Sequence, residues 1–397
     1  MTLRRSPCTP RVAASPRGRS LGFTLVELMV GLVLGLLTVL VITQVLALAE
    51  GKKRTVSTGA DAQVNGALSL YTLQREIQGA GYGAASSPTA LGCAIKGKYV
   101  STTAGVPPAD ISFTLAPVVI KDGTAGAPDE ITLLQSQTSL FSAPIRLTET
   151  HDKSLEYFMV QSSLGIAPGD LMVAVPPTPS ATDWCTLFVA TNNTANAATT
   201  LGPTRVPHTA AGNPAWNSTD IWPTAAYEGV PTTVATAKSY LLNMGTLTQR
   251  TYKVNAATNS LQVTAITSQS ASSSATDLFP QIANLQAMYG KDTDADGVVD
   301  RWDTTTPTTQ ADWTRVLAVR VAIVARSNQY ERDEVTSAAP QWDVGASDTI
   351  VGPATATCSG SANKCIAIKI DHLADWKHYR YKVYDAVIPL RNMLWNS

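Results

Sequence analysis

The acidic segment DTDADGVVDRWD, residues 292 to 303, has the residue types and the spacing of a calcium-binding loop. Asp292, Asp294 and Asp296 stand at positions 1, 3 and 5 of the twelve-position pattern, and Gly297 follows at the sharp turn. The pattern adds as ligands the main-chain carbonyl of Val298 and the carboxylates of Asp300 and Asp303. Because carboxylates this close together repel one another without a cation, we predict a calcium site here.

Two features set this loop apart from an EF-hand. Asp303 closes the loop where an EF-hand has glutamate, so its shorter side chain is expected to weaken binding. The segment TTTPTTQ that follows does not favour an exiting helix, so we expect an isolated loop that leads into a strand over 316–325. The alternative is a solvated acidic turn that holds no ion.

Glu27 is the only charged residue in the apolar run from Phe23 to Ala49. This run is longer than the roughly 20 residues that a helix needs to cross a membrane. Five arginines and no acid precede it, so the positive-inside rule places residues 1–22 in the cytoplasm and the rest of the chain across the membrane. An acid inside such a span costs roughly 3 kcal/mol and usually marks function. An ordinary membrane anchor, the alternative, gives no reason for Glu27.

Four cysteines follow the apolar run, and Cys8 precedes it. An even number in an exported chain suggests disulfides, with three possible pairings. Cys358 and Cys365 enclose only six residues, which favours a local bridge and leaves Cys93 to pair with Cys185. A zinc site is the alternative, but no CxxC motif and no cluster of histidines accompanies these cysteines.

Charge and motifs argue against several function classes. Without the arginines of the first 22 residues, 25 basic residues face 30 acidic ones, and this net charge of −5 is not that of a general nucleic-acid binder. The segment WKHYRYKVY, read as a strand, places His378, Arg380 and Lys382 on one face. That face could suit single-stranded DNA, but a terminal strand with one packed and one solvated face is the simpler interpretation.

No enzyme signature is present in the sequence. GxSxG, HExxH and kinase-like motifs are missing, and the four histidines are not spaced as ligands on one element. The segment GCAIKGKY imitates a phosphate loop but has Tyr99 where serine or threonine would hold magnesium. We therefore predict a protein that is not an enzyme.

The first element that must position these residues is a long helix. Beyond the apolar run, apolar residues recur at three- and four-residue spacing as far as Ile77. Glycines at 79, 81 and 83 favour a helix end there. We therefore expect one helix from Phe23 to Gln78, roughly 84 Å long at 1.5 Å per residue.

The rest of the chain is expected to be rich in β-strands. Short β-branched and apolar runs, bounded by turn residues, predict strands at DEITLLQS, DLMVAVP, TLFVAT, SYLLNMG, RTYKVNA, LQVTAIT and VLAVRVAIVARS. In the last of these, alternation predicts that the face with Leu317, Val319, Val321 and Ile323 lies in the core. The Ala/Thr/Ser/Pro-rich segments 191–238 and 269–276 are expected to be surface loops that bury little.

The segment GFTLVELMVGLVL resembles the processing motif of type IV prepilins and type II secretion pseudopilins. The resemblance implies that a prepilin peptidase cuts between Gly22 and Phe23 and methylates the new N-terminus at Phe23. Glu27 then becomes the fifth residue of the mature chain. In such filaments this carboxylate is thought to meet the N-terminal amine of a neighbouring subunit, which offsets the cost of burying either charge alone.

Three further segments resemble the PilW family of minor pilins. They are LQREIQGAGYG, YGKDTDADGVVDRW followed by ADWTRVLAVRVAIVARS, and HYRYKVYDAVIPLRN. The resemblance implies a minor pilin needed for assembling type IV pili. A type II secretion minor pseudopilin, the nearest alternative, shares the N-terminal motif but lacks this C-terminal ending.

Together, these patterns predict an α+β, pilin-like protein. Its parts are a cleaved leader (1–22), a membrane-spanning and fibre-core half-helix (23–50), an amphipathic half-helix (51–78) and a large antiparallel β-rich head (79–397). The resemblance implies residence in the bacterial inner membrane and then in the pilus. It also implies contact with other minor and major pilins, prepilin peptidase and the inner-membrane assembly machinery. The competing function is that of a membrane-tethered calcium-binding adhesin that does not polymerise.

Overall fold

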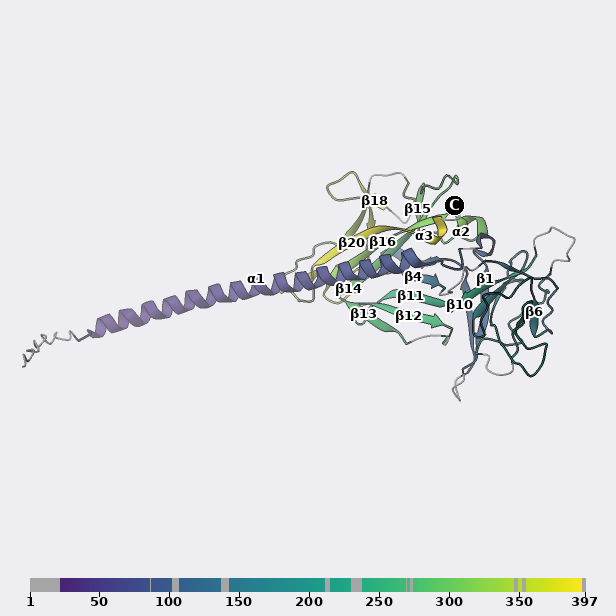
Figure 1. The fold of residues 1–397 in the computed structure, drawn as a ribbon. Coiled ribbons are helices and arrows are strands. Elements are labelled where there is room, and N and C mark those ends of the chain that lie inside the picture. Colours follow the sequence, from purple (N-terminus) through teal and green to yellow (C-terminus); the bar gives the residue numbers. More distant parts are fainter. Residues whose placement is uncertain are drawn as a thin grey trace, which may run out of the picture. The chain divides into compact units, whose positions relative to one another are not determined.

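The computed structural model of the chain divides into two compact units after Val56. Helix α1, Leu25–Gly79, contributes to both units (Figure 1). It confirms the predicted helix over 23–78 to within two residues at each end. The residues that the structure describes are 22–85, 87–101, 107–136, 143–210, 215–229, 238–268, 270–271, 274–345, 349–351 and 355–394.

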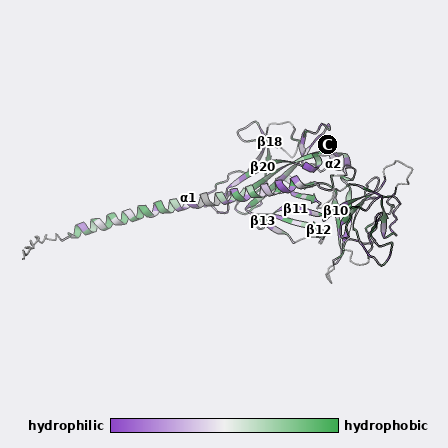
Figure 2. Cartoon of the chain, viewed as in Figure 1, coloured by the Kyte–Doolittle hydropathy of each residue, from purple (hydrophilic) through white to green (hydrophobic). Residues whose placement is uncertain are grey.

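The first unit consists of the N-terminal part of α1. In the described part of the chain, Leu25–Gly51 is the one helical segment long and apolar enough to cross a membrane. None of it is buried within the protein, and its hydrophobic residues cover the helix along its length (Figure 2). Such a segment requires lipid or another apolar partner around it.

The second unit holds the predicted β-rich head, and two of its sheets come from the first half of the head. Strand order in the larger sheet is β2-β1-β8-β7-β10-β5, antiparallel except where β1 runs parallel to β8. The smaller sheet pairs β6 with β9. The strands are β1 (Ala94–Tyr99), β2 (Ala109–Thr114), β5 (Ile145–Arg146), β6 (Tyr157–Met159), β7 (Leu171–Val175), β8 (Cys185–Val189), β9 (Arg205–Pro207) and β10 (Tyr240–Gly245).

Two further sheets, both antiparallel, complete the centre of the head. Their strand orders are β13-β12-β11-β4-β3 and β15-β14-β16-β20. The strands are β3 (Val118–Lys121), β4 (Glu130–Gln135), β11 (Thr248–Asn255), β12 (Ser260–Thr267), β13 (Thr276–Pro280), β14 (Ile282–Lys291), β15 (Arg301–Asp303), β16 (Val316–Arg326) and β20 (Tyr381–Pro389). All seven strands expected from the sequence are present, and β14 is among the strands that were not predicted.

A three-stranded sheet and several short helices make up the remainder. The sheet order is β17-β19-β18, with β17 (Gln341–Gly345), β18 (Thr355–Thr357) and β19 (Lys364–Ala367). The short helices are η1 (Pro88–Ala90), η2 (Thr124–Gly126), α2 (Gln310–Thr314), η3 (Trp376–His378) and α3 (Arg391–Leu394). Because η3 is helical, the prediction that the whole of WKHYRYKVY is one strand was wrong, and β20 begins only at Tyr381.

Strand β16 is buried on both faces, not on one as predicted. Val319, Val321 and Ile323 pack into the core that includes α1, whereas Ala322 and Val324 pack against β17 and β19 in a second core. A central strand covered on both faces is apolar almost throughout, and this strand is interrupted only by Arg320. The expected alternation therefore identified one real core face and missed the other.

The expectation that 191–238 buries little was also wrong for its described residues. Trp216, Ile221, Trp222 and Tyr227 each keep less than a tenth of their surface exposed. Each aromatic ring removes enough apolar area from water to anchor a segment that is otherwise made of small and polar residues. The segment 269–276 is described only in part, and its described residues are at least partly exposed.

Candidate functional site

The N-terminal turn of α1 carries the predicted processing and assembly residues. Gly22, Phe23 and Thr24 precede the helix in extended or irregular backbone, and Phe23 is 82% exposed. The Thr24 hydroxyl accepts a hydrogen bond from the backbone N–H of Glu27 at 3.2 Å. Threonine at the cap and glutamate three residues later form the pattern of a capping box.

Glu27 therefore has a local role that sequence reasoning missed. An acid in the first turn interacts favourably with the positive end of the helix dipole. The T-x-x-E spacing before an apolar run was the signal that could have revealed this role. The local role is compatible with the predicted one, because the cap uses the backbone N–H of Glu27 and its carboxylate remains exposed.

Within the head, the inner face of α1 packs on the sheets. Ala62, Leu73 and Ile77 belong to the core that contains β14 and β16. Gly66 lies where an added Cβ would come within 2.6 Å of the Tyr384 ring. The helix can approach β20 this closely because position 66 has no side chain.

The outer face of the same helix carries a second apolar stripe. Val64, Leu68 and Tyr71 occupy successive turns and are 55%, 45% and 63% exposed. At 100° per residue, they point away from the face that carries Leu73 and Ile77. A surface helix normally shows polar residues on this side, so we treat Val64, Leu68 and Tyr71 as an outer stripe that suits a partner.

The predicted calcium loop forms a tight turn between β14 and β15. Gly297 and Ala295 both have positive φ, 85° and 69°. The carboxylate of Asp292 accepts hydrogen bonds from the N–H of Ala295 at 2.6 Å and from that of Gly297 at 2.9 Å. Thr293 donates through its N–H and its hydroxyl to Asp300, which fixes the far side of the loop.

Three of the predicted ligands converge. One carboxylate oxygen each from Asp292, Asp294 and Asp300 lies within 4.8 Å of the other two. Asp296 is outside this group, and its carboxylate accepts the N–H of Val298 at 2.7 Å. The chemistry of the convergent set fits a hard cation such as calcium, which takes oxygen ligands and accepts solvent in its remaining positions.

The charges of this group act on one another. Partial desolvation, followed by repulsion from Asp296 and Asp300, raises the pKa of Asp294. For Asp292, desolvation is opposed by the N–H groups of Gly297 and Ala295, and the net effect lowers its pKa. The loop therefore holds one carboxylate firmly ionised beside another that is destabilised by its neighbours, and a bound cation would relieve this repulsion.

Asp303 does not belong with these ligands in the structure. Its buried carboxylate accepts hydrogen bonds from Lys291 Nζ at 2.6 Å and from Arg301 Nε at 2.8 Å. It also lies within β15, opposite Tyr289 of β14. The assignment of Asp303 as the twelfth-position ligand is therefore corrected. Lys291 and Arg301 neutralise its carboxylate, and the pairing of β15 with β14 holds it away from the turn.

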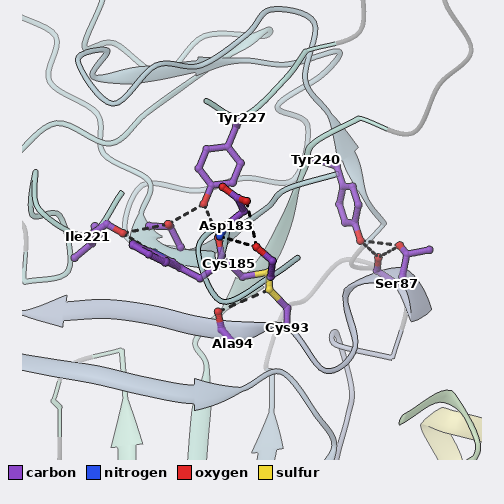
Figure 3. The surroundings of a disulfide bond; sticks show 12 residues. Ser87, Cys93, Ala94, Asp183, Cys185, Ile221, Tyr227 and Tyr240 are labelled. Atoms are coloured by element: carbon purple, nitrogen blue, oxygen red, sulfur yellow. Dashed lines mark hydrogen bonds between the residues drawn. A yellow bond between two sulfur atoms is a disulfide. The ribbon is translucent and has the colours of Figure 1, made fainter. Parts of the chain in front are cut away.

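Both predicted disulfides are present. Cys93, which precedes β1, bonds to Cys185 at the start of β8, with the two Cα atoms 6.0 Å apart (Figure 3). Cys358 bonds to Cys365 across a short turn beside β19. Because all four sulfur atoms are bonded in pairs, the zinc alternative does not describe these cysteines.

The structure also brings together two histidines that sequence reasoning treated as unrelated. His151 and His208 are 57 residues apart, yet their Nε2 atoms lie 2.8 Å from each other in a buried site. Desolvation lowers the pKa of His151 to about 4 and places that of His208 well below its usual range. No spacing in the sequence signals this pair, because the fold of the intervening segment creates it.

Comparison with protein families decides the identity of the C-terminal part. The model of the family described as type IV pilus-assembly protein W, PilW, matches residues 247–392. This match supports a PilW-family type IV pilus protein. The matched residues run from β11 to α3 and include the acidic loop and both core faces of β16. No curated protein and no solved structure matches the chain.

The PilW match does not cover residues 1–246. Helix α1 and the strands from β1 to β10 precede residue 247. The side chains of α1 nevertheless complete the core of the PilW part, because Leu73 and Ile77 pack with β14 and β16. The helix therefore shares its core with the matched part, and the PilW match supports involvement in type IV pilus assembly.

Proposed function

We propose that this PilW-family protein is a minor pilin that is cut between Gly22 and Phe23 and enters the pilus through its N-terminal helix. The observation that carries the proposal is the outer stripe of Val64, Leu68 and Tyr71. A helix that only tethers a head to a membrane needs one apolar face within the head. A second apolar face on the same turns is expected where the helix also packs against another subunit.

Glu27 is proposed to act after processing. The new amine at Phe23 lies beyond the capped turn, and the Glu27 carboxylate is exposed. In an apolar fibre core, an amine and a carboxylate from neighbouring subunits offset much of each other's desolvation cost. Such a pair also fixes the stagger between the subunits.

The proposed location and partners follow from the same elements. The apolar segment Leu25–Gly51 would hold the protein in the inner membrane, with the head outside the cytoplasm, until it joins the pilus. Its partners would be other minor and major pilins, prepilin peptidase and the inner-membrane assembly machinery. A type II secretion pseudopilin remains the alternative, and the PilW match favours the pilus.

Intact-mass analysis and pilus counts test this proposal together. In piliated cells, the protein should begin with N-methyl-Phe23, and Gly22→Ala should retain the first 22 residues. Leu68→Glu should reduce pili without unfolding the head, since residue 68 is exposed. Gln63→Glu, an exposed position off the outer stripe, is the matched control. Normal piliation with Leu68→Glu, or an uncut wild-type chain in piliated cells, contradicts the proposal.

We also propose that the loop between β14 and β15 binds calcium. The support is the convergence of Asp292, Asp294 and Asp300 on a turn whose backbone N–H groups already orient two of them. The backbone carbonyl of Val298 and the carboxylate of Asp296 are near enough in sequence to add ligands. Water molecules can complete a set of six or more oxygen ligands. The ion would supply charge neutralisation that lets β14 and β15 remain paired above this turn.

Melting of the full chain in detergent, with calcium and with a chelator, tests the site. A ligand that binds only the folded state at a hundredfold excess over its Kd adds about 2.7 kcal/mol of stability. Asp294→Asn together with Asp300→Asn should abolish the calcium-dependent shift, whereas the exposed control Asp371→Asn should keep it. Equal melting temperatures of the wild type in calcium and in chelator would exclude the site.

A further inference from the structure

The segment between β5 and β10 forms a lobe with its own buried aromatic core. Its core residues include Phe158 of β6, Phe188 of β8, Trp222 and Tyr227. The lobe precedes the residues matched by the PilW family. We use "lobe" for residues 145–229 as far as the structure describes them.

His151 and His208 sit inside this core and join three segments of the lobe. The backbone of His151 exchanges two hydrogen bonds with Tyr227, at 2.8 and 2.9 Å. The N–H of His208 donates to the carbonyl of Glu156, just before β6, at 2.8 Å. The Nε2 to Nε2 contact then links these two connections directly.

The surroundings of the two rings are apolar. His151 is 2% exposed and stacks on Phe158 with ring centroids 3.9 Å apart, while His208 is 5% exposed and lies 4.6 Å from Trp222. His151 Nδ1 is buried without a hydrogen-bond partner in the described structure. A second ring nitrogen is thus available to a proton, and although the nearby backbone of Leu155 favours the charged ring, burial outweighs this effect.

The contact requires that at least one of the two Nε2 atoms carries no hydrogen. One Nε2 carries a hydrogen and donates it, and the other accepts with its lone pair. A first added proton places a positive charge among aromatic rings, which is costly without a paired anion. A second added proton occupies the accepting lone pair and sets two N–H groups against each other, so the contact must break.

We propose that the His151–His208 pair is a pH-sensitive switch that holds the lobe closed at neutral pH and lets it open when the surroundings become acidic. Opening exposes the imidazoles to water and brings His151 nearer to carboxylates on the rim of the lobe. The charged groups on the elements that pack around the pair are Asp152, Lys153, Glu156, Asp183, Arg205 and Glu228 with its partner Lys238.

These charged groups alter the pKa values of the two histidines less than burial does. Asp152 lies beside His151 and favours the charged form of its ring. Because the Asp152 carboxylate is exposed to solvent, it does not accompany the ring in the buried core. Glu228 is already paired with Lys238 at 2.9 Å. Burial therefore dominates, and it lowers the pKa of both histidines.

Hydrogen exchange on the full chain in detergent tests the proposal at two pH values. One is about pH 7, above the unfolded histidine pKa of about 6.5, and the other is about pH 4.5, below it. After correction for intrinsic exchange, protection of the His151, His208 and Tyr227 amides should fall as pH decreases. The fall should approach about tenfold per pH unit for each proton taken up on opening. Amides in β14 and β16 should keep their protection.

His208→Gln keeps a hydrogen-bonding group beside His151 and removes one titrating ring. It should weaken the pH dependence of lobe protection by about one proton, a tenfold change per pH unit. His372→Gln, an exposed histidine outside the lobe, is the matched control and should behave as wild type. Lobe protection that is equal at both pH values, or His208→Gln with the full wild-type response, overturns the proposal.

A measurement on the wild type covers the case in which His208→Gln does not fold. The ring nitrogens of His151 and His208, followed by NMR, should stay neutral well below the ordinary histidine pKa of about 6.5. They should become charged only as the lobe amides lose protection. Titration of both rings near 6.5 with the lobe still closed would overturn the switch.

Discussion

The carboxylate of Glu76, in the last turns of α1, accepts a hydrogen bond from Arg250 Nη1 of β11 at 2.6 Å. Gln135 of β4 donates to the same carboxylate oxygen at 3.1 Å. The two partners stand on neighbouring strands, so one carboxylate fixes the helix end to two strands at once. Arg250 lies within the PilW match and Glu76 lies before it, which makes this contact a junction between the helix and the family domain.

We predict that Glu76→Ala lowers the free energy of unfolding of the head by about 1–2 kcal/mol, because a partly buried guanidinium loses its partner. The side chains of Glu76 and Arg250 are 21% and 36% exposed, so solvent screens part of the interaction. Urea unfolding measures the loss. Glu130→Ala, which removes an exposed pair with Lys121, is the control and should cost less than about 0.5 kcal/mol. Equal losses in the two variants would remove the role assigned to Glu76.

Asp129 gives a pH-dependent prediction. It is 1% exposed, and burial raises its pKa to about 7, although Gly123 and Ala287 donate their N–H groups to its two oxygens. Between the unfolded pKa of about 3.8 and the folded one, the folded state holds a proton that the unfolded state releases. Stability from this group is therefore complete below about pH 4 and is lost as pH rises through about 7.

Asp129→Asn does not titrate, so its unfolding free energy relative to wild type should rise with pH across this window. The rise should approach about 1.4 kcal/mol per pH unit. Urea unfolding at several pH values measures the difference, with the exposed Asp371→Asn as control. A difference independent of pH would mean that the two N–H donors outweigh burial and keep Asp129 ionised.

Local patterns in the sequence were sufficient for the elements and for parts of the site. Periodicity gave α1, β-branched runs gave seven strands, and the short spacing of Cys358 and Cys365 gave both disulfides. Each of these features depends on neighbours along the chain. Strand β14 was missed because Asn284, Gln286 and a glycine interrupt its apolar run, although both amide side chains are buried and bonded to backbone carbonyls.

Contacts between distant residues could not be read from spacing. The twelve-position pattern assigned Asp303 to calcium. The pairing of β14 with β15 instead brings Lys291 beside it, and because a buried carboxylate needs a charge partner, Asp303 forms an ion pair with Lys291. The His151–His208 pair arises in the same way, from the folding of a lobe around both rings. Position in a sheet, rather than position in a motif, decided these roles.

The two disulfides should contribute unequally to stability. Bridging closes 92 residues of separation for Cys93 and Cys185 but only seven for Cys358 and Cys365. Loop-closure entropy in the unfolded chain then predicts a loss of about 4.7 kcal/mol when the first bridge is replaced by two serines, and of about 2.5 kcal/mol for the second. Denaturant unfolding of the two double variants measures the order. A larger loss for Cys358→Ser with Cys365→Ser would show that native contacts outweigh loop length.

Gly66 allows a prediction in which helix propensity and packing have opposite signs. Alanine stabilises an exposed helix position by about 1 kcal/mol relative to glycine. At position 66 the added Cβ would lie 2.6 Å from the Tyr384 ring of β20 and 3.0 Å from the Cβ of Ala325 in β16. The ring can move slightly, but Ala325 is attached to a central strand that cannot. We therefore expect Gly66→Ala to destabilise the head by about 1–3 kcal/mol, as overpacking does.

A double-mutant cycle separates this collision from other effects of the substitution. Tyr384→Ala removes the ring that the new methyl group would strike, so Gly66→Ala should cost less in that background than in wild type. The difference should be at least about 0.5 kcal/mol, the size expected of residues in contact. Urea unfolding of the wild type, both single variants and the double variant supplies the cycle. Additive effects, or a Gly66→Ala variant more stable than wild type, would show that α1 does not rest on β20 through this glycine.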